Sequence, residues 1–192
     1  MAAWQDLVAR LAQAESTDRV LKPGDILPGF MLPNAEGKLV SSEELLAQGP
    51  LVLTFYRGEW CPYCTLTLEA LETALPEIEA AGGQLVALSP EIGGRALSVK
   101  QAYGLHYEVL SDVDSGVALA CGVAFRMPEA YREGALRANI DLGRRYGNDG
   151  WFVPIPASFI VDPSGVVREV FADSDFTRRP EPAEIVAALK RL

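Results

Sequence analysis

The feature that most constrains the fold is a strand that runs into a helix through a Cys-x-x-Cys motif. Leu51–Tyr56 is an unbroken run of apolar and β-branched residues, with the length of a strand buried on both faces. From residue 65 onward, leucine and isoleucine recur at helical spacing, so a helix should begin at or just after Cys61. We therefore expect Cys61 and Cys64 at the junction between strand and helix.

This position favours redox chemistry at Cys61 and Cys64. Free backbone N–H groups and the helix dipole stabilise a thiolate at a helix N-terminus, and the thiolate is the form of cysteine that attacks peroxides and disulfides. Two cysteines separated by two residues in a helical turn can also close a disulfide bond. The pair is predicted to be a reversible dithiol/disulfide couple. Arg57 would lower the pKa of these thiols and Glu59 would raise it, and the spacing does not decide between them.

Composition limits the remaining possibilities. A chain of 192 residues can bury a sizeable core, so residues 1–192 are expected to form one domain. The net charge of −9 disfavours nucleic acid and anionic membranes as partners. Three cysteines are too few for a disulfide scaffold, and the sequence shows neither a signal-peptide pattern nor an apolar run of transmembrane length. A cytoplasmic protein with working thiols, and without a cofactor or metal, fits these features.

Before the motif, the chain is predicted to form a helix and a hairpin. Trp4, Leu7, Val8 and Leu11 share one face of an N-terminal helix within residues 1–21, which either packs on the domain or makes a homodimer contact. Two short apolar segments around residues 30–40 flank a turn and predict a hairpin.

After the motif, strands and helices alternate. Gln84–Ser89 and Tyr107–Leu110 are predicted strands separated by a helix, which indicates a mostly parallel sheet covered on both faces. Residues 125–150 break this order, and we interpret them as an insertion with one helix from Pro128 and then a loop. The turn at residues 162–165 predicts a closing hairpin, and a last helix follows over residues 182–192.

The order of these elements around the Cys-x-x-Cys motif resembles the thioredoxin fold. The resemblance implies an α/β protein with a central mixed sheet, helices on both faces, and an N-terminal helix and hairpin as an extension. Trp60 before the first cysteine is similar to thioredoxins, whereas Cys-Pro-Tyr-Cys is the tetrad of glutaredoxins. The resemblance also implies a cis bond between Ile155 and Pro156, which would place backbone beside the thiols.

Most of the chain from Lys22 to Phe171 resembles the alkyl hydroperoxide reductase/thiol-specific antioxidant (AhpC/TSA) family of peroxiredoxins. The similarity is most specific in KPGDILPGFMLPNAEGKLVSSEELLAQGPLVLTFY, and extends to LVALSPE, QAYGLHYEVLSD and ASFIVDPSGVV. In this correspondence four family residues fall on positions of this chain: the active-site proline, the threonine, the peroxidatic cysteine and the peroxide-binding arginine fall on Arg57, Cys61, Cys64 and Pro156, in that order. Only the cysteine is retained, and Arg57 is a candidate replacement for the missing cation.

Several other residues have both a structural and a functional interpretation. Tyr56 and Trp60 either line the thiol pocket or belong to the core. Cys121 is interpreted as a buried core thiol rather than a distant resolving cysteine, and His106 as a structural or surface residue. With the cysteine pair, these two would match the ligand count of a Cys₃His zinc site, although they lie far from it in sequence.

Two groups of arginines also allow two interpretations. The loop that contains Arg178 and Arg179 is either a solvated surface or docks near the redox site. The arginines of residues 125–150 either bind an anionic substrate such as glutathione or belong to a mixed charged surface, and we favour the mixed surface.

Three functions are consistent with these features: an enzyme that cycles a Cys61–Cys64 disulfide, a redox sensor without turnover, and a structural zinc protein. We favour an oxidoreductase that reduces peroxides or disulfides and is itself reduced by a thioredoxin- or glutathione-type thiol. A thioredoxin-like reaction would use Cys61, as the more exposed thiol, for attack, and a peroxidase-like reaction would use Cys64. Because the family's threonine and arginine are missing, we expect slow peroxide turnover, with disulfide exchange at least as efficient.

Overall fold

The fold is built on a five-stranded mixed sheet with the order β5-β4-β3-β8-β9. The computed structural model describes residues 2–13 and 17–192, and the side chain of Trp4 lies outside the described part. The first three strands along the chain are parallel, and the last two are antiparallel to their neighbours. The strands are β3 (Leu51–Phe55), β4 (Gln84–Ser89), β5 (Glu108–Ser111), β8 (Ala157–Val161) and β9 (Val167–Ala172). The predicted thioredoxin-like mixed sheet is confirmed.

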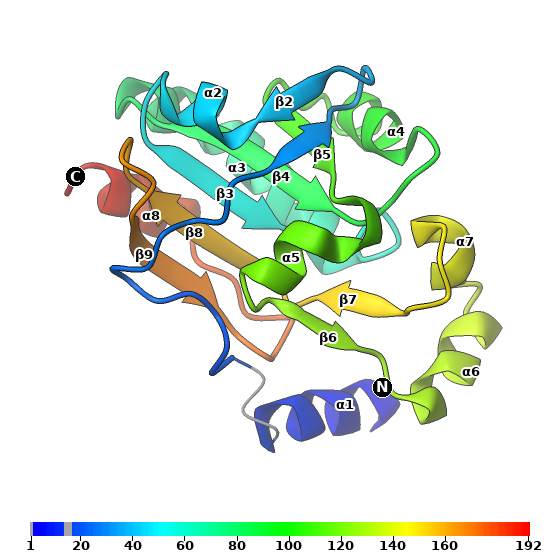
Figure 1. Cartoon of the computed structure of the whole chain (residues 1–192). Helices are drawn as coiled ribbons and strands as arrows, with labels where there is room; N and C mark the ends of the chain where they lie inside the picture. The colour runs from blue at the N-terminus through cyan, green and yellow to red at the C-terminus, as the bar shows by residue number, and fades with distance from the viewer. Residues whose placement is uncertain (1, 14–16) are drawn as a thin grey trace.

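Helices cover both faces of this sheet (Figure 1). One face packs against α3 (Pro62–Ala80), α4 (Arg95–Ala102) and α8 (Pro182–Leu189), and the other against α2 (Ser42–Leu46) and α5 (Gly116–Ala120). Side chains of β3 alternate between the two cores, with Val52 in the first and Leu51 and Leu53 in the second. This alternation explains why β3 is apolar throughout. No helix in the described ranges is long and apolar enough to cross a bilayer.

The predicted hairpin is confirmed as β1 (Met31–Pro33) paired antiparallel with β2 (Leu39–Ser41). Its turn is organised by Asn34, whose side-chain oxygen accepts hydrogen bonds from the backbone of Glu36 and Lys38. Ser41 then caps α2 by accepting a hydrogen bond from the backbone N–H of Glu44. The sequence signals at this turn are local, which is why they predict the hairpin correctly.

The N-terminal helix α1 (Ala2–Gln13) is shorter than the predicted range of residues 1–21. The chain has already left the helix by Val20, which is buried in the core, and the N–H of Leu21 donates to the carbonyl of Cys121 at 3.1 Å. In an α-helix this N–H would instead donate to the carbonyl of residue 17, so the pairing lies outside the helix. The helix nevertheless packs on the domain, as predicted, because Leu7 is buried and Asp6 accepts a hydrogen bond from Tyr131.

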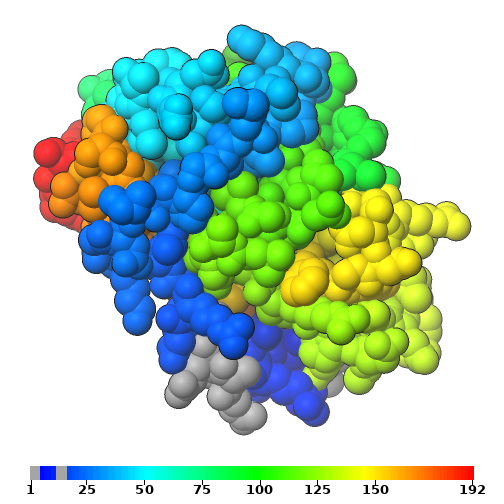
Figure 2. Space-filling view, in the orientation of Figure 1, coloured from blue at the N-terminus to red at the C-terminus, as the bar shows by residue number. Residues whose placement is uncertain are grey.

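The insertion is more ordered than predicted. Its two arms, β6 (Ala124–Arg126) and β7 (Phe152–Pro154), form an antiparallel pair, and the predicted loop contains a second helix, α7 (Leu142–Tyr146), after α6 (Glu129–Arg137). A small core of its own explains this order, since Met127, Leu142, Tyr146 and Trp151 pack together. Figure 2 shows the yellow and light-green insertion on the right of the molecule, reaching the dark-blue α1 below.

The predicted cis bond before Pro156 is wrong, because the described residues contain no cis peptide bond. The chain between β7 and β8 runs on in an extended path, and the N–H of Ile155 donates to the carbonyl of Val123 at 2.5 Å, extending the β6–β7 pairing. This strand-to-strand connection favours the trans isomer, because a cis bond would turn the chain.

The turn that holds residues 17–21 against α5 can be tested at Gly122. Its φ is +72°, and an added Cβ would lie 1.9 Å from the carbonyl oxygen of Arg19, so Gly122→Ala should lower the free energy of unfolding by about 2 kcal/mol or more. Gly134→Ala, in α6 with open space around it, should instead raise it by up to about 1 kcal/mol. Thermal unfolding measures both, and a Gly122→Ala protein as stable as the wild type would contradict this close approach.

Candidate active site

The two cysteines lie at the start of α3, as predicted. Cys61 is the N-cap residue, with extended backbone, and Pro62 occupies the first helical turn. The backbone N–H groups of Cys64 and Thr65 donate to the carbonyl of Cys61, at 2.9 and 3.1 Å. Both thiols are free, and each cysteine is only 1% exposed. The expectation that Cys61 is the more exposed of the two is therefore wrong.

Arg57 is the cation of the site. Its Nη2 donates a hydrogen bond to Sγ of Cys61 at 3.0 Å, and its backbone N–H donates to Sγ of Cys64 at 3.5 Å. The guanidinium is buried between two aromatic rings, 5.0 Å from the centre of Trp60 and 4.0 Å from that of Phe176. The sequence did not decide whether Arg57 or Glu59 acts on the thiols. In the structure, Arg57 is in direct contact with the thiol of Cys61.

These contacts make the two thiols unequal. A hydrogen bond from the thiol of Cys64, followed by the charge of Arg57, lowers the pKa of Cys61 to about 5, although burial opposes the change. Burial raises the pKa of Cys64 well above its ordinary value, and the hydrogen bond that Cys64 gives to Cys61 raises it further. At neutral pH, Cys61 is a thiolate and Cys64 is a neutral thiol.

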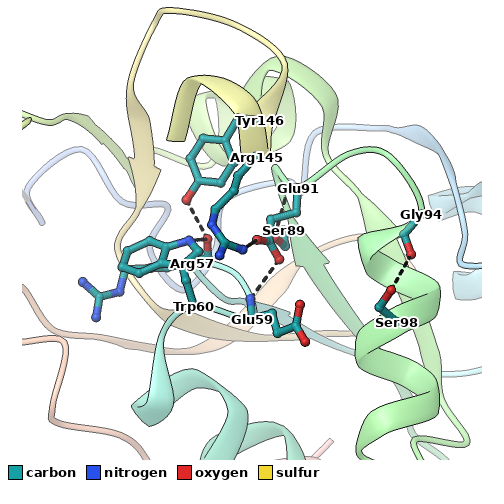
Figure 3. A network of polar contacts seen from close by, with 9 residues as sticks. All are labelled: Arg57, Glu59, Trp60, Ser89, Glu91, Gly94, Ser98, Arg145 and Tyr146. Atoms are coloured by element: carbon teal, nitrogen blue, oxygen red, sulfur yellow. Dashed lines mark hydrogen bonds and ion pairs between the residues drawn. The ribbon is translucent and has the colours of Figure 1, made fainter. Parts of the chain in front are cut away.

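The insertion holds the backbone of Arg57 in place (Figure 3). The hydroxyl of Tyr146 donates to the carbonyl of Arg57 at 2.6 Å, and Nε1 of Trp60 donates to the same oxygen at 3.1 Å. Trp60 thus supports the site both through this hydrogen bond and through its ring. Because two hydrogen bonds fix this carbonyl, the backbone of Arg57 is held where its side chain reaches Cys61.

A buried ion pair holds the neighbouring turn. Glu91 is 1% exposed, accepts a hydrogen bond from the backbone N–H of Glu59 at 2.8 Å, and pairs with Arg145 of α7 at 3.1 Å (Figure 3). Burial raises the pKa of Glu91. Gly58 has no room for a side chain here, because an added Cβ would lie 2.6 Å from the Glu91 carboxyl carbon. Glu59 contributes to the site through its backbone N–H, which donates to Glu91.

Sequence reasoning missed Tyr146, Glu91 and Arg145. Tyr146 and Glu91 contact a turn that lies 89 and 32 residues away in sequence, and no short motif joins them to it. One signal was available in LVALSPE, where Glu91 follows a buried strand parallel to β3, so it leaves the sheet at the same edge as the cysteines.

The two cysteines face different spaces. Cys61 lines a cavity of about 520 Å³, whose walls also include Trp60, Tyr63 and Phe176, with Gln5 and Val8 from α1 and Ile140 from the insertion. Cys64 lines a space of about 10 Å³, which is about the volume that one water needs. The predicted site residues divide accordingly, with Arg57 and Trp60 on the Cys61 side and Tyr56 and Pro156 on the Cys64 side.

One of the two arginines after β9 docks at the site. Nη2 of Arg179 lies 3.8 Å from Sγ of Cys64, whereas Arg178 is exposed and pairs with Asp173 and Asp175. The arginines of the insertion mostly pair with neighbouring carboxylates, as in the mixed surface that we predicted: Arg132 with Glu129, Arg137 with Glu133 and Arg144 with Asp141.

Cys121 and His106 lie apart from the cysteine pair. Cys121 belongs to the core on the opposite face of the sheet, and burial raises the pKa of its thiol to about 12. His106 is exposed, and its Nδ1 lies 2.6 Å from Glu72. In the part of the chain that the structure describes, no three potential metal ligands come together.

Comparison with known proteins identifies the family of the chain. The model of the AhpC/TSA family matches residues 23–170. This chain belongs to the AhpC/TSA family. Peroxiredoxin Bcp of Escherichia coli is similar, at 29% identity over 153 residues, which cover 80% of this chain and 86% of Bcp. A Mycobacterium tuberculosis protein with a peroxiredoxin name is 33% identical over 102 residues, which cover 53% of this chain and only 64%, less than two thirds, of that protein.

Solved structures with peroxiredoxin names share the fold. The crystal structure of peroxidoxin BcpB from Mycobacterium tuberculosis aligns with a TM-score of 0.72 at 21% identity, covering 90% of this chain and 98% of BcpB. The thioredoxin-like peroxiredoxin fold is therefore confirmed.

The role of Arg57 can be tested by titrating the Cys61 thiolate. Since a cation favours the charged form, Arg57→Met should raise the pKa of Cys61 above its wild-type value of about 5. The thiolate ultraviolet absorbance, which the wild type loses as the pH falls through about 5, should then be lost at higher pH. Arg144→Met, which removes an exposed arginine, is the matched control and should leave the titration unchanged. An unchanged titration in Arg57→Met would contradict this role.

Proposed function

We propose that this protein is a thiol-dependent peroxidase in which Cys61 attacks the peroxide and Cys64 resolves the product. The observation that carries the proposal is the 3.0 Å contact between the Arg57 guanidinium and Sγ of Cys61. This contact places a cation beside a nucleophilic thiolate, and both residues line the cavity of about 520 Å³. The peroxiredoxin names of the relatives support the same reaction class.

In the first step, the Cys61 thiolate attacks the terminal oxygen of a hydroperoxide. The S–O bond forms as the O–O bond breaks, Cys61 becomes a sulfenic acid, and the departing alkoxide or hydroxide takes a proton from water. Negative charge develops on the departing oxygen, and the Arg57 guanidinium is placed to stabilise it. Arg57 thereby supplies the cation that the family's arginine would supply at the position of Pro156.

In the second step, Cys64 attacks the sulfur of the Cys61 sulfenic acid. The S–S bond forms, the S–O bond breaks, and hydroxide leaves and is protonated to water. One external dithiol of the thioredoxin type, or two thiols of the glutathione type, as found in the cytoplasm, then supply two electrons and two protons to restore both thiols.

Two observations favour Cys61 over Cys64 as the attacking residue. Cys61 is the ionised thiol of the pair, and it lines the cavity of about 520 Å³. The family's peroxidatic position corresponds to Cys64, but the space beside Cys64 is about 10 Å³. A substrate larger than hydrogen peroxide therefore has room only beside Cys61.

The same geometry favours a peroxide over a protein disulfide as substrate. A protein disulfide needs an accessible thiolate, but Cys61 is 1% exposed, and the cavity that it lines is partly walled by Phe176 and by residues of α1. A small hydroperoxide needs a cavity and a cation instead. The proposal therefore departs from our sequence-based expectation that disulfide exchange would be at least as efficient.

Cysteine variants test the order of attack. Cys61→Ser should reduce peroxide consumption to the buffer background, because it removes the thiolate. Cys64→Ser should still react once and leave Cys61 as a sulfenic acid, which dimedone traps for mass spectrometry. Cys121→Ser, a matched change in the core, should retain turnover. Loss of the first reaction in Cys64→Ser with retention in Cys61→Ser would assign the attack to Cys64 and overturn the proposed order.

The oxidised product provides a further test. After one equivalent of hydrogen peroxide, peptide mapping should find a disulfide between Cys61 and Cys64, with Cys121 still available for alkylation once the protein is denatured. A bridge from Cys121 to either cysteine would contradict the resolving role of Cys64. Oxidation without repeated turnover in the presence of thioredoxin or glutathione would instead support a redox sensor.

A further inference from the structure

We infer that Arg179 is a catalytic residue of the second half-reaction, where it stabilises the Cys64 thiolate that closes the disulfide. This inference rests on the proposed function. Nη2 of Arg179 lies 3.8 Å from Sγ of Cys64, and the two residues line the same small space together with Pro156. Arg179 thus contacts a reacting atom, and it lines a different space from the one that Arg57 and Cys61 line.

Cys64 needs such a cation because it must ionise in a buried place. A neutral thiol is a poor nucleophile, and burial is the main reason why the pKa of Cys64 is high. In the reduced protein, the Cys61 thiolate adds a negative charge beside it and keeps Cys64 protonated. Once Cys61 has become a sulfenic acid, that charge is gone, and the charges of Arg57 and Arg179 then oppose the burial that keeps Cys64 neutral.

The titratable groups that act on Cys64, or on which Cys64 acts, come from four elements: Cys61 and Arg57 around the start of α3, Tyr56 after β3, Tyr146 in α7 and Arg179 after β9. Burial raises the pKa of both tyrosines, so they are neutral at physiological pH. Arg57 and Arg179 therefore carry the positive charge that lowers the pKa of Cys64.

The loop holds Arg179 in this orientation. Its Nη1 donates to the carbonyl of Arg178 at 2.8 Å, which leaves Nη2 directed at Cys64. The following Pro180 restricts the backbone of Arg179 to extended conformations. Glu181 then forms a capping box with Glu184 at the start of α8, so the loop ends on a fixed helix.

The chemistry requires no additional reactant. Cys64 loses its proton, its thiolate attacks the sulfur of the Cys61 sulfenic acid, and the hydroxide that leaves combines with that proton to give water. Arg179 neither donates nor accepts a proton in this step. Its charge increases the fraction of Cys64 that is ionised, and the rate of closure depends on that fraction.

Arg179→Gln tests this role, and Arg178→Gln, in the adjacent exposed arginine, is the matched control. In rapid-quench experiments with hydrogen peroxide, Arg179→Gln should form the Cys61 sulfenic acid at the wild-type rate, as measured by dimedone trapping. Closure at neutral pH should be slower by about three- to fourfold for each unit by which the pKa of Cys64 rises, because the ionised fraction falls about tenfold while a thiolate of higher pKa is the better nucleophile. Raising the pH should restore it, and Arg178→Gln should match the wild type throughout.

The outcomes separate this inference from the proposed function. If wild-type protein forms no sulfenic acid with peroxide, the proposed function fails. If the wild type reacts and Arg179→Gln closes the disulfide at the wild-type rate, only the role of Arg179 is wrong. A slower first step with unchanged closure, or a closure defect that higher pH does not restore, would also overturn that role.

Discussion

The contact between a buried guanidinium and a buried thiol is the constraint on which the rest of this structure depends. Placing the Arg57 charge away from water is costly unless an anion and favourable surroundings compensate it. The Cys61 thiolate provides the anion, and the rings of Trp60 and Phe176 provide the surroundings. Because these groups come from the start of α3 and from the loop after β9, the reactive centre forms only when distant parts of the chain fold together.

The insertion is best understood as a support for this contact. Its small core positions α7, and α7 contributes one hydrogen bond to the backbone of Arg57 and one ion pair to the adjacent turn. The usual threonine and arginine of the AhpC/TSA family are absent at Cys61 and Pro156. Our proposal is therefore that the same catalytic requirement, a cation beside a thiolate, is met here by different residues.

Features encoded locally could be predicted from the sequence. The run of apolar residues in β3 predicted the buried central strand, and the Cys61–Cys64 motif predicted the start of α3. Arg57 was recognised because it lies four residues before Cys61, but its contact could not be, since the path of the turn depends on Tyr146 and Glu91. The helix α7 was missed because five residues are too few to show periodicity, and the bond before Pro156 was misjudged because the β6–β7 pairing is not visible in a linear pattern.

The residues that line the cavity of about 520 Å³ come partly from inside and partly from outside the segment that matches the AhpC/TSA family. The AhpC/TSA match spans residues 23–170, which include both cysteines and Arg57, whereas Gln5 and Val8 precede it and Phe176 follows it. The shared part of the chain thus holds the two cysteines and Arg57, and the flanking segments form part of the wall of the cavity that Cys61 lines. Selection on which molecules enter can act on those flanks while the reactive atoms stay constant, so two relatives with the same reaction centre can diverge in substrate preference through their termini alone.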